Sequence, residues 1–570
     1  MSDVIPSEGE FAPPRPSCVS GLDGLMRKTA KIHGSDLCDI WMVSREYGEL
    51  AGAGGVKDVV FQLAKALARS GKRRVSVVLP RYGFMAPEAE GFQSVMDPLC
   101  PYQELALSIQ MNLPKQRMCE GVRFYVKEEN GVKIYLIEGE RFREKHNVYT
   151  YTDEEEKSVA WKKASEGHAD YFAMNVLLQK AALELLIALC VRPSIIHCHD
   201  GHTALLPAMI REIAGYKTYF RGTAAVVTVH NAGRGYHQEI TDLPFAAAVS
   251  GLPPQVIDGN RLENKFDPLL VASSYSLVNT VSENYARELM DTDSDYMTGW
   301  FGHTLKARNI VLHGITNGID PELYNPESFA GGDPDFIYDP ANKEDNLHGK
   351  ARCRRELLLM LEHGLHGTLH QHGTLAQLEN ATIFTFVGRI NNDKGVDSLI
   401  AVLPTLLQRH PDCQVLLLGD GDVGLEEQLA FHAEQPEFAG RFCFLDGYDS
   451  DIGRLIFATG DFFMIPSRFE PCGLTDFIAQ LYGNIPIVRH VGGLVKVKDG
   501  KTGLAYSGIS MESLLDALER AIALSAEERR KIQYQAVQEI YSHYTWDEVM
   551  KKYLSFYDES RAQQINCVQK

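Results

Sequence analysis

The sequence predicts an α/β fold in which two doubly wound parallel sheets form two Rossmann-like domains that face each other across a cleft. The chain has 570 residues, which at roughly 100–200 residues per domain is too long for one hydrophobic core. Short apolar runs that end in Gly, Asn, Asp or Ser alternate with helical patterns, as in parallel sheets covered by helices on both faces. The same alternation occurs in both halves of the chain, which indicates two such domains.

The strands are predicted from the apolar runs, and two regions are predicted as helical. In the first half the strands are residues 39–44, 75–80, 133–138, 195–200, 224–231 and 277–282. In the second half they are residues 383–390, 414–419, 442–446, 461–467 and 485–490. Residues 350–361 have an amphipathic helical pattern, and residues 525–557 predict two helices joined near Thr545.

The domain boundaries follow from changes in composition. Residues 1–35 are expected to be a disordered tail, because the first 17 residues are acidic and proline-rich and lack the apolar core of a secretion signal. Residues 36–326 form the predicted N-terminal domain, and the Gly-, Pro- and Asp-rich residues 327–349 form a linker. Residues 350–540 form the C-terminal domain. Residues 541–570 are expected to be a helix that packs back on the N-terminal domain.

The overall charge excludes two classes of partner. Lys plus Arg number 57 against 75 for Asp plus Glu, a net charge of −18. Nucleic acids and anionic membranes both require clustered positive charge, so neither is an expected partner. No run of about 18 apolar residues predicts a membrane span. The 11 cysteines form no CxxC pairs, which favours a reducing cytoplasm.

Candidate ligand-binding residues follow the predicted strands of the first half, because open α/β sheets bind ligands beyond the carboxyl ends of their strands. Residues 50–59 form a glycine-rich turn, and the helix after it directs its positive end at any anion. Asp200 ends one strand and His230 the next, so two polar strand ends converge on one site. His197, His199 and His202 could suggest a metal, but buried histidines that only satisfy backbone groups are the favoured interpretation.

A second set of histidines lies between the predicted domains. His363, His366, His370 and His372 are interleaved with Gly and Thr. A metal site needs a complete ligand set, and no cysteine or carboxylate nearby completes one. A solvated loop is therefore expected here, and neither a metal nor another cofactor is predicted anywhere in the chain.

The second half contains cations and a carboxylate at strand ends. Arg389 and Lys394 are five residues apart in a loop and could bind a diphosphate, Arg through its fork and Lys as a point charge. In residues 465–475 a strand ends, a loop carries Glu470, and a helix begins near Thr475 with free N–H groups for an anion. Cys472 has no histidine near it in sequence, so it is expected to fill space rather than act as a nucleophile.

These motifs resemble those of the bacterial glycogen synthases and plant starch synthases, retaining glucosyltransferases of the GT-B fold. The resemblance runs from about residue 39 to residue 557. Its strongest element is SRFEPCGLT (residues 467–475) followed by YGNIPIVRHVGGL (residues 482–494), and HCHD, TVHN, NTVSENYARE, GITNGIDPELYNP and VGRINNDKG also match. The resemblance implies glucose transfer with retention from a nucleotide-glucose donor, with ADP-glucose favoured over UDP-glucose, to the non-reducing end of an α-1,4-glucan.

The resemblance also implies roles for individual residues. Arg389 and Lys394 match the pair that binds the donor diphosphate, Glu470 matches the carboxylate that holds the transferred glucose, and His230 matches a histidine near that glucose. Donor-binding positions match Gly54, Gly55, Asp58, Tyr448, Cys472, Gly473, Leu474 and Thr475. Acceptor-side positions match Asp200, His202 and Asn231. The family requires no metal.

Three positions depart from the family pattern. Gly52 stands where the family has a lysine, Gly201 where it has a tryptophan, and Lys496 where it has a carboxylate. Lys57 is the cation closest in sequence to Gly52, but at about 100° per residue it is expected to point roughly 140° away from position 52.

Two other functions remain open. One is a GT-B transferase with a small acceptor, although many such relatives carry a second glutamate eight residues after the first, where this chain has Ile478. The other is a non-catalytic glucan-binding protein, which would have no need to retain Arg389, Lys394, Glu470 and His230.

Overall fold

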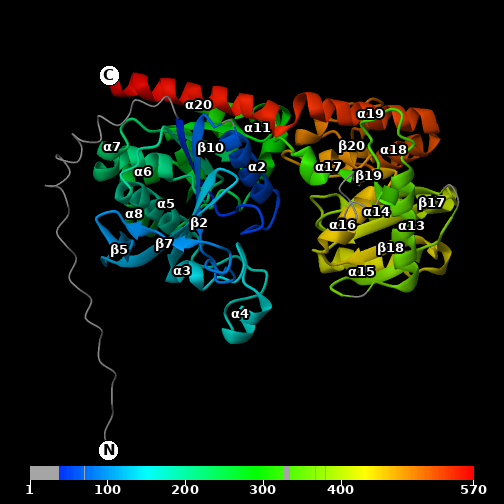
Figure 1. The fold of residues 1–570 in the computed structure, drawn as a ribbon, viewed down its shortest axis with the longest axis horizontal. Coiled ribbons are helices and arrows are strands. Elements are labelled where there is room, and N and C mark those ends of the chain that lie inside the picture. The colour runs from blue at the N-terminus through cyan, green and yellow to red at the C-terminus, as the bar shows by residue number, and fades with distance from the viewer. Residues whose placement is uncertain (1–37, 70, 327–333, 366, 379–380, 570) are drawn as a thin grey trace, which may run out of the picture.

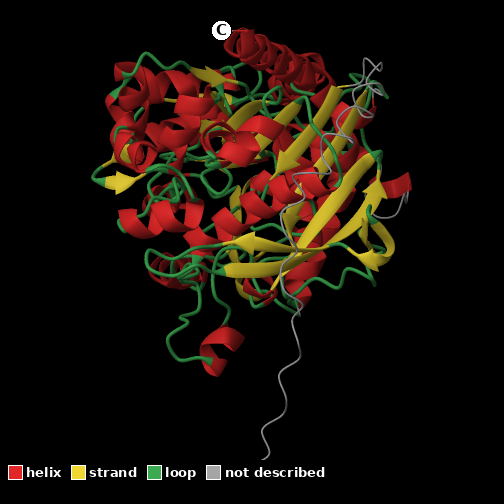
Figure 2. Ribbon diagram, turned by 90° about the vertical axis from the view of Figure 1, so that its left-hand side faces the viewer, coloured by secondary structure: helices red, strands yellow, loops and turns green. Residues whose placement is uncertain are grey.

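The computed structural model describes residues 38–569 except residues 70, 327–333, 366 and 379–380. It contains two sheets flanked by helices, one in each half of the chain (Figures 1 and 2). The predicted fold class is therefore confirmed. The predicted tail (residues 1–35), His366 and most of the glycine-rich part of the predicted linker lie outside the described residues.

The first sheet has the strand order β14-β13-β10-β9-β1-β2-β8-β7-β3, with β6 also paired to β7. The seven strands from β14 to β8 are parallel, and β7, β3 and β6 are antiparallel additions at one edge. The strands are β1 (Cys38–Val43), β2 (Arg73–Pro80), β3 (Gln93–Ser94), β6 (Ala106–Gln110), β7 (Cys119–Glu129), β8 (Val132–Gly139), β9 (Ile195–His199), β10 (Ala224–Val229), β13 (Leu277–Thr280) and β14 (Leu312–Gly314). Two small hairpins pair β4 (Met96–Asp97) with β5 (Cys100–Glu104) and β11 (Arg261–Leu262) with β12 (Lys265–Phe266).

The helices of the N-terminal half connect these strands. They are α2 (Gly55–Arg69), α3 (Glu140–Arg143), α4 (Asp153–Ser158), α5 (Tyr171–Ala188), α6 (Leu206–Glu212), α7 (Ala214–Tyr219), α8 (Leu243–Ser250), α9 (Pro254–Gly259), α10 (Pro268–Tyr275), α11 (Glu283–Asp291) and α12 (Phe301–Ala307), with 3-10 helices η1 (Asp293–Thr298) and η2 (Pro321–Tyr324). Among the described residues, α5 is the one helix long and apolar enough to cross a membrane, but 78% of it is buried inside the protein. Its apolar surface is accounted for as a core helix.

The second sheet has the strand order β15-β18-β17-β16-β19-β20-β21. All its strands are parallel except β15, which is antiparallel to β18. They are β15 (His370–Leu375), β16 (Thr382–Val387), β17 (Cys413–Gly419), β18 (Arg441–Asp446), β19 (Phe462–Ile465), β20 (Ile485–Arg489) and β21 (Leu504–Tyr506). The expectation of a solvated loop is wrong for His363, which ends helix α13 (His348–His363), and for His370 and His372. The last two lie on edge strand β15, in which every residue before Leu375 is polar or glycine, so no apolar run marks the strand.

The helices of the C-terminal half are α13 (His348–His363), α14 (Val396–Arg409), α15 (Val423–Ala433), α16 (Ser450–Thr459), α17 (Thr475–Leu481), α18 (Met511–Ala523), α19 (Ala526–His543) and α20 (Trp546–Gln569), with 3-10 helices η4 (Pro334–Phe336), η5 (Pro436–Phe438) and η6 (Gly492–Lys496). Helix α19 begins at a capping box in which Ser525 and Glu528 satisfy each other's backbone N–H groups. The two predicted C-terminal helices are present and meet at residues 544–545.

The last helix, α20, runs along the N-terminal half of the molecule (Figure 1). Its Tyr557 hydroxyl lies 2.9 Å from Nδ1 of His197, and its Ser560 hydroxyl donates to the carbonyl of Ala225 at 3.0 Å. Trp546, at its start, donates to Gln62 of α2 at 2.6 Å. The end of the chain is thus part of the core of the first domain.

Each sheet reverses its winding direction at one point. In the first sheet, β2 and β8 lie on one side of β1, and β9, β10, β13 and β14 lie on the other side, so the direction reverses between β1 and β9. In the second sheet the direction reverses between β16 and β19. Ligands of doubly wound folds bind in the crevice at such a switch point. The loops that follow β1, β9, β16 and β19 therefore define the candidate site, and they contain most of the residues singled out from the sequence.

Candidate active site

Glu470 is the centre of the C-terminal half of the site. It lies in the loop between β19 and α17, and only 9% of the residue is exposed. Its Oε2 accepts a hydrogen bond from Nζ of Lys394 at 2.6 Å and another from the Ser467 hydroxyl at 3.0 Å. The structure therefore brings together two residues that are 76 positions apart in sequence, one from each loop at the switch point.

The surroundings of Glu470 keep it ionised. Burial alone would raise its pKa, but the charge and hydrogen bond of Lys394, the Ser467 hydroxyl and the charge of Lys496 together lower the pKa below its ordinary value. A buried carboxylate with these partners is a strong hydrogen-bond acceptor at neutral pH. It can receive hydroxyl groups of a bound sugar.

Residues 472–475 continue the loop of Glu470 into α17. Gly473 has a φ of +74°, in the left-handed region that favours glycine, and Leu474 directly precedes α17, which begins at Thr475 as predicted. Cys472 is buried, and burial raises the pKa of its thiol to about 11. A thiol that stays protonated at neutral pH is a poor nucleophile, which agrees with its expected space-filling role.

Arg389 and Tyr448 are the exposed members of the predicted donor set. Arg389 lies in the loop after β16, and the described residues give its guanidinium no hydrogen-bond or ion-pair partner. Tyr448 follows β18 and is 71% exposed. Both side chains are accessible to a ligand, one as a cation and one as an aromatic surface.

The polar residues of the N-terminal half form a buried cluster at the ends of β9 and β10. Nδ1 of His199 lies 3.0 Å from Nε2 of His230, which orients the His230 ring. Asp200 has a left-handed φ of +58° and accepts the backbone N–H of His230 at 2.6 Å. The His202 ring stacks at a tilt on Tyr149 with a centroid separation of 5.1 Å. Asn231, in the same loop, accepts the N–H of Gly233 at 2.7 Å.

Burial disfavours the charged form of each ionisable group in this cluster. Desolvation lowers the pKa of His230 to about 3 and places the pKa of His202 well below its ordinary value. It also raises the pKa of Asp200 to about 7, with the nearby Glu46 carboxylate adding to the effect. The histidines are therefore neutral at pH 7. His197 is a buried structural residue, as expected, but its ring bonds the hydroxyls of Tyr557 and Thr228 and not the backbone groups that were expected.

Four further residues complete this side of the site, and the sequence search missed them. Arg45 and Glu46 directly follow β1, and both are almost fully buried. Glu46 accepts a hydrogen bond from the Tyr149 hydroxyl and the N–H of Ala53 at 2.9 Å, while Arg45 lies 5.0 Å from the Tyr149 ring centroid and bonds the Tyr82 hydroxyl. A charged pair immediately after a buried strand is the signal that could have revealed them, because buried charges need a specific reason.

The glycine-rich loop (residues 50–59) lies between the polar cluster of the N-terminal half and the loop of Glu470. Its Ala53 N–H binds Glu46, and a Cβ added at Gly55 would lie 3.2 Å from Cδ1 of Leu474. At Gly54 an added Cβ would meet nothing within 4 Å. Asp58, in the first turn of α2, is half-buried, and burial raises its pKa to about 6. The first turn of α2 and the loop of Glu470 therefore face each other between the two halves.

The expected direction of Lys57 is wrong. A Cβ built on Gly52 would lie 2.4 Å from Cδ and 2.6 Å from Cβ of Lys57, so the lysine side chain covers Gly52 directly. The helical-wheel argument fails because α2 begins at Gly55 and residue 52 is in a loop that turns back over the helix start. Nζ of Lys57 pairs with Glu49 at 3.0 Å.

Gly201 is also explained by a close contact. A Cβ at this position would lie 2.4 Å from the carbonyl oxygen of His237 and 2.7 Å from that of Tyr236. The loop that contains these residues is held by a buried pair of His237 with Asp267, 2.6 Å apart, and the pKa of His237 rises to about 9 because the charge and hydrogen bond of Asp267 outweigh burial. Backbone thus occupies the space that a side chain at position 201 would need.

The two halves are joined by hydrogen bonds beside the site. The Ser282 hydroxyl donates to the carbonyl of Pro471 at 2.8 Å, and the Asn284 amide donates to the carbonyl of Gly492 at 2.9 Å. Both oxygens of Glu288 accept the Gly492 N–H at 3.0 Å. Helix α11 of the N-terminal half therefore contacts the same two segments that surround Glu470.

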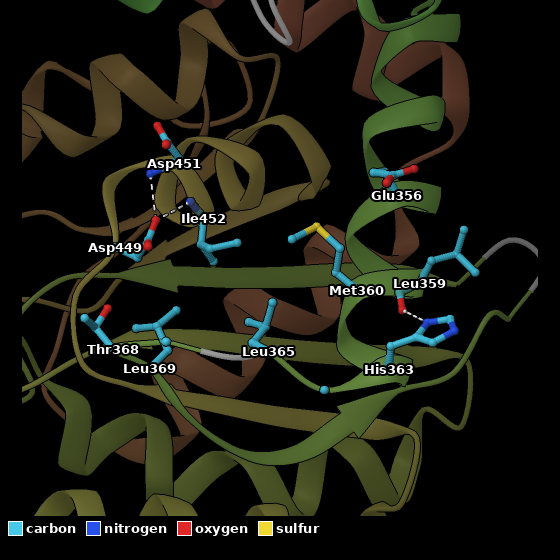
Figure 3. Close-up of a pocket in the computed structure, with 12 residues that line it drawn as sticks. Glu356, Leu359, Met360, His363, Leu365, Thr368, Leu369, Asp449, Asp451 and Ile452 are labelled. Carbon is cyan, nitrogen blue, oxygen red and sulfur yellow. Dashed lines mark hydrogen bonds between the residues drawn. The ribbon is translucent and has the colours of Figure 1, made fainter.

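A pocket of 710 Å³ lies elsewhere, between α13 and the start of α16 (Figure 3). It is lined by apolar residues such as Met360 and Leu365, and by polar groups that bond within the protein. Asp449 caps α16 through the N–H groups of Asp451 and Ile452, and Nδ1 of His363 bonds the carbonyl of Leu359 (Figure 3). None of the predicted site residues lines this pocket. In the described part of the chain, no group of three or more His, Cys, Asp or Glu side chains is placed to hold a metal ion.

Two doubly wound domains whose switch-point loops meet, with the buried Glu470–Lys394 ion pair on one side and buried neutral histidines on the other, define a glycosyltransferase of the GT-B class. The family model of the starch synthase catalytic domain matches residues 39–307, and that of group 1 glycosyl transferases matches residues 371–539. Glycogen synthase 1 of Geobacter sulfurreducens is 31% identical over 461 residues, covering 80% of this chain and 81% of that protein. The chain belongs to the glycogen and starch synthase family, and it is a glucosyltransferase.

Other relatives agree over a greater length. Glycogen synthase of Photobacterium profundum is 28% identical over 532 residues, which cover 91% of this chain and 94% of that protein. Among solved structures, the catalytic domain of starch synthase IV from Arabidopsis thaliana has a TM-score of 0.71 at 24% identity and covers 93% of this chain and 100% of that one. This structural likeness extends over both domains, as expected for a shared GT-B fold.

Proposed function

We propose that this enzyme transfers glucose with retention of configuration from ADP-glucose to the non-reducing end of an α-1,4-glucan. The observation that supports the proposal is the Glu470–Lys394 pair at 2.6 Å, a carboxylate and a cation on adjacent loops of one switch point, to which we assign sugar binding and phosphate binding. The Arabidopsis starch synthase IV structure was determined with ADP and acarbose bound, which favours an adenine nucleotide here.

The donor is expected to bind across the C-terminal loops. Arg389 and Lys394 bind the diphosphate, and the N–H groups of Gly473, Leu474 and Thr475 add hydrogen bonds to it or to the sugar. Tyr448 contacts the base, Cys472 fills space beneath the loop, and Glu470 accepts glucose hydroxyls. Negative charge grows on the departing diphosphate, and fixed cations stabilise that charge without reorganising.

The N-terminal cluster is expected to hold the transferred glucose and the acceptor end. Neutral His230 hydrogen-bonds the glucose, and Asp200, His202 and Asn231 contact the acceptor. Gly54, Gly55 and Asp58 approach the donor from the opposite side to Glu470. Holding the acceptor hydroxyl and the donor carbon in contact lowers the entropic part of the barrier.

Transfer of radiolabelled glucose onto glycogen tests the proposal. ADP-glucose and UDP-glucose are supplied separately, and the labelled polymer is precipitated and digested with an α-1,4-specific amylase. We expect more label to be incorporated from ADP-glucose than from UDP-glucose. The amylase should release this label as labelled maltose. Incorporation from UDP-glucose alone would overturn the donor assignment. Glycogen binding without any transfer would support a non-catalytic glucan-binding protein instead.

A further inference from the structure

Lys496 and Asp476 form an ion pair that is fully enclosed by the protein. Lys496 is the last residue of η6, and Asp476 lies in the first turn of α17. Their side chains are 6% and 0% exposed, and Nζ lies 3.1 Å from Oδ1. The ammonium also lies 4.5 Å from the centroid of the Phe477 ring. A buried lysine is costly, so each of its partners is informative.

The other partners of Lys496 are main-chain carbonyls of the donor loop. Its Nζ lies 2.5 Å from the carbonyl oxygen of Cys472 and 2.8 Å from that of Gly473, with the carbonyl of Gly493 at 3.3 Å. One ammonium thus connects the loop of Glu470 to η6. The connection is close-packed, because a Cβ added at Gly473 would lie 3.2 Å from Nζ of Lys496.

Further contacts fix the same two segments to each other. The carbonyl of Glu470 accepts the N–H of Gly493 at 2.9 Å. A Cβ at Gly492 would lie 2.0 Å from that carbonyl oxygen, and a Cβ at Gly493 would lie 2.1 Å from the carbonyl oxygen of Cys472. The two segments therefore touch backbone to backbone, and Lys496 bonds the carbonyl of Cys472 at this same contact.

We propose that Lys496 is a positioning residue of the transferase, whose ammonium holds the carbonyls of Cys472 and Gly473 so that Glu470 and the N–H groups of residues 473–475 face the donor, with Asp476 as its counter-ion. This role rests on the proposed function of the Glu470 loop. The charge of Lys496 also helps to lower the pKa of Glu470. The lysine at this position, where the family usually has a carboxylate, is therefore part of the construction of the site in this chain.

The test separates positioning from simple structural support. Lys496→Met removes the charge and keeps the length, but it leaves Asp476 buried without a counter-ion. The double variant Lys496→Met, Asp476→Asn removes both charges and isolates the loss of the hydrogen bonds to the carbonyls. Lys498→Met is the matched control, because that lysine pairs with Glu539 on the surface at 2.5 Å.

We expect the double variant to recover most of the melting temperature that Lys496→Met loses. Its kcat should stay about 10- to 100-fold below wild type, with the KM for glycogen unchanged, because only the donor loop is displaced. Lys498→Met should keep wild-type kcat. A double variant that recovers both stability and kcat would overturn the proposal, since the pair would then be structural support alone.

Hydrogen exchange gives a readout that does not depend on transfer. We expect faster exchange of the amides of residues 470–478 in the double variant than in wild type, with α19 unchanged. Unchanged exchange at residues 470–478 would refute the positioning role. If wild type transfers no glucose but this exchange still accelerates, the proposed function fails while the positioning of the loop by Lys496 stands.

Discussion

The two halves of the site treat ionisable groups in opposite ways. In the C-terminal half, Glu470 is buried yet ionised, because Lys394 lies 2.6 Å from it and Lys496 adds a second positive charge. In the N-terminal half, the described residues give Asp200 no ion-pair partner, and burial raises its pKa to about 7 although the charge of His237 acts to lower it. The histidines beside it are held neutral by the same desolvation.

This difference matches the ligands proposed for each half. A nucleotide diphosphate is charged, and charge accumulates on it as the glycosidic bond to glucose breaks, so fixed cations are needed there. Sugar hydroxyls are neutral and both donate and accept hydrogen bonds. A neutral histidine also both donates and accepts hydrogen bonds, and so does a carboxyl group in its protonated form. Neither group then places a full charge next to the sugar. The distribution of charge therefore indicates that the nucleotide diphosphate lies against the C-terminal half and the sugar hydroxyls against the N-terminal half.

Among the substitutions in the C-terminal half of the site, replacing Glu470 should cause the largest loss of turnover. Glu470→Gln keeps the shape but removes the anionic acceptor and leaves Lys394 unpaired. We expect turnover to fall by roughly 10³-fold or more, because the lost interaction strengthens in the transition state. ADP affinity, measured by calorimetry, should change by only several-fold. Near-normal turnover in this variant would contradict the assignment of Glu470 to the transferred glucose.

The two cations should be distinguishable from each other. Arg389→Ala and Lys394→Ala should each lower turnover by roughly 10²–10³-fold, the scale for one removed stabilising donor. Of these two cations, Lys394 is the one that lowers the pKa of Glu470, so Lys394→Ala and not Arg389→Ala should raise the pH at which activity is lost on the acid side. Rate profiles from about pH 4 to 8 check this, because a pKa of Glu470 below its ordinary value puts the wild-type acid limb at the low end of this range. Parallel acid limbs in both variants would show that Lys394 does not control Glu470.

Much of this site could be predicted from the sequence, and the rest has physical reasons for being missed. A buried parallel strand and the residues directly after it can be recognised from a short stretch of sequence. Strands β16 and β19 were therefore predicted correctly, and so was the position of Glu470 in a loop at a strand end. Strand β7 was missed because its exposed face is polar and it has no continuous apolar run. Lys57 was wrongly placed because its position depends on how a loop folds back, which helix periodicity does not describe. The contact of Lys496 with Asp476 joins residues that are distant in sequence.

The neutral half can be tested through the pH dependence of stability. The pKa of Asp200 in the folded protein, about 7, is above the unfolded value near 3.9, so the folded state holds a proton that the unfolded state releases. The contribution of Asp200 to stability therefore falls as pH rises from about 4 to 7 and is constant above that range. Asn does not titrate, so Asp200→Asn should remove this loss of stability with rising pH.

We expect the urea midpoint of Asp200→Asn, relative to wild type, to increase from pH 5 to pH 8. Asp97→Asn is the control, because Asp97 also accepts a backbone N–H but lies on the surface. Its midpoint relative to wild type should not change over this pH range. A relative midpoint of Asp200→Asn that stays constant would mean that Asp200 is ionised in the folded protein and that the N-terminal half is not neutral.

The smallest expected effects concern Gly52 and Lys57, where the two halves meet. Gly52→Ala places a Cβ 2.6 Å from Cβ of Lys57, an atom close to the helix backbone that cannot move aside easily. We expect a loss of about 1–3 kcal/mol in the free energy of unfolding, the usual cost of overpacking. The same substitution in a Lys57→Ala background should cost less, because Cδ and Cγ of Lys57, at 2.4 and 2.8 Å from the new Cβ, are then absent and only the Cβ contact remains. Equal costs in both backgrounds would show that Lys57 does not cover Gly52.

Lys57 itself should contribute little to donor binding. Its Nζ is already paired with Glu49, whose side chain is 92% exposed, and exposed pairs are worth about 0–1 kcal/mol. We expect Lys57→Ala to weaken ADP binding by less than about tenfold. Because Lys57 fills the space over Gly52, a lysine introduced at position 52 should strengthen ADP binding only when Lys57 is also alanine. Calorimetry on Gly52→Lys with and without Lys57→Ala measures this difference. A large loss of ADP affinity in Lys57→Ala alone, with an unchanged melting temperature, would instead identify Lys57 as the cation that takes the place of the family lysine, reached from a different position in the same loop.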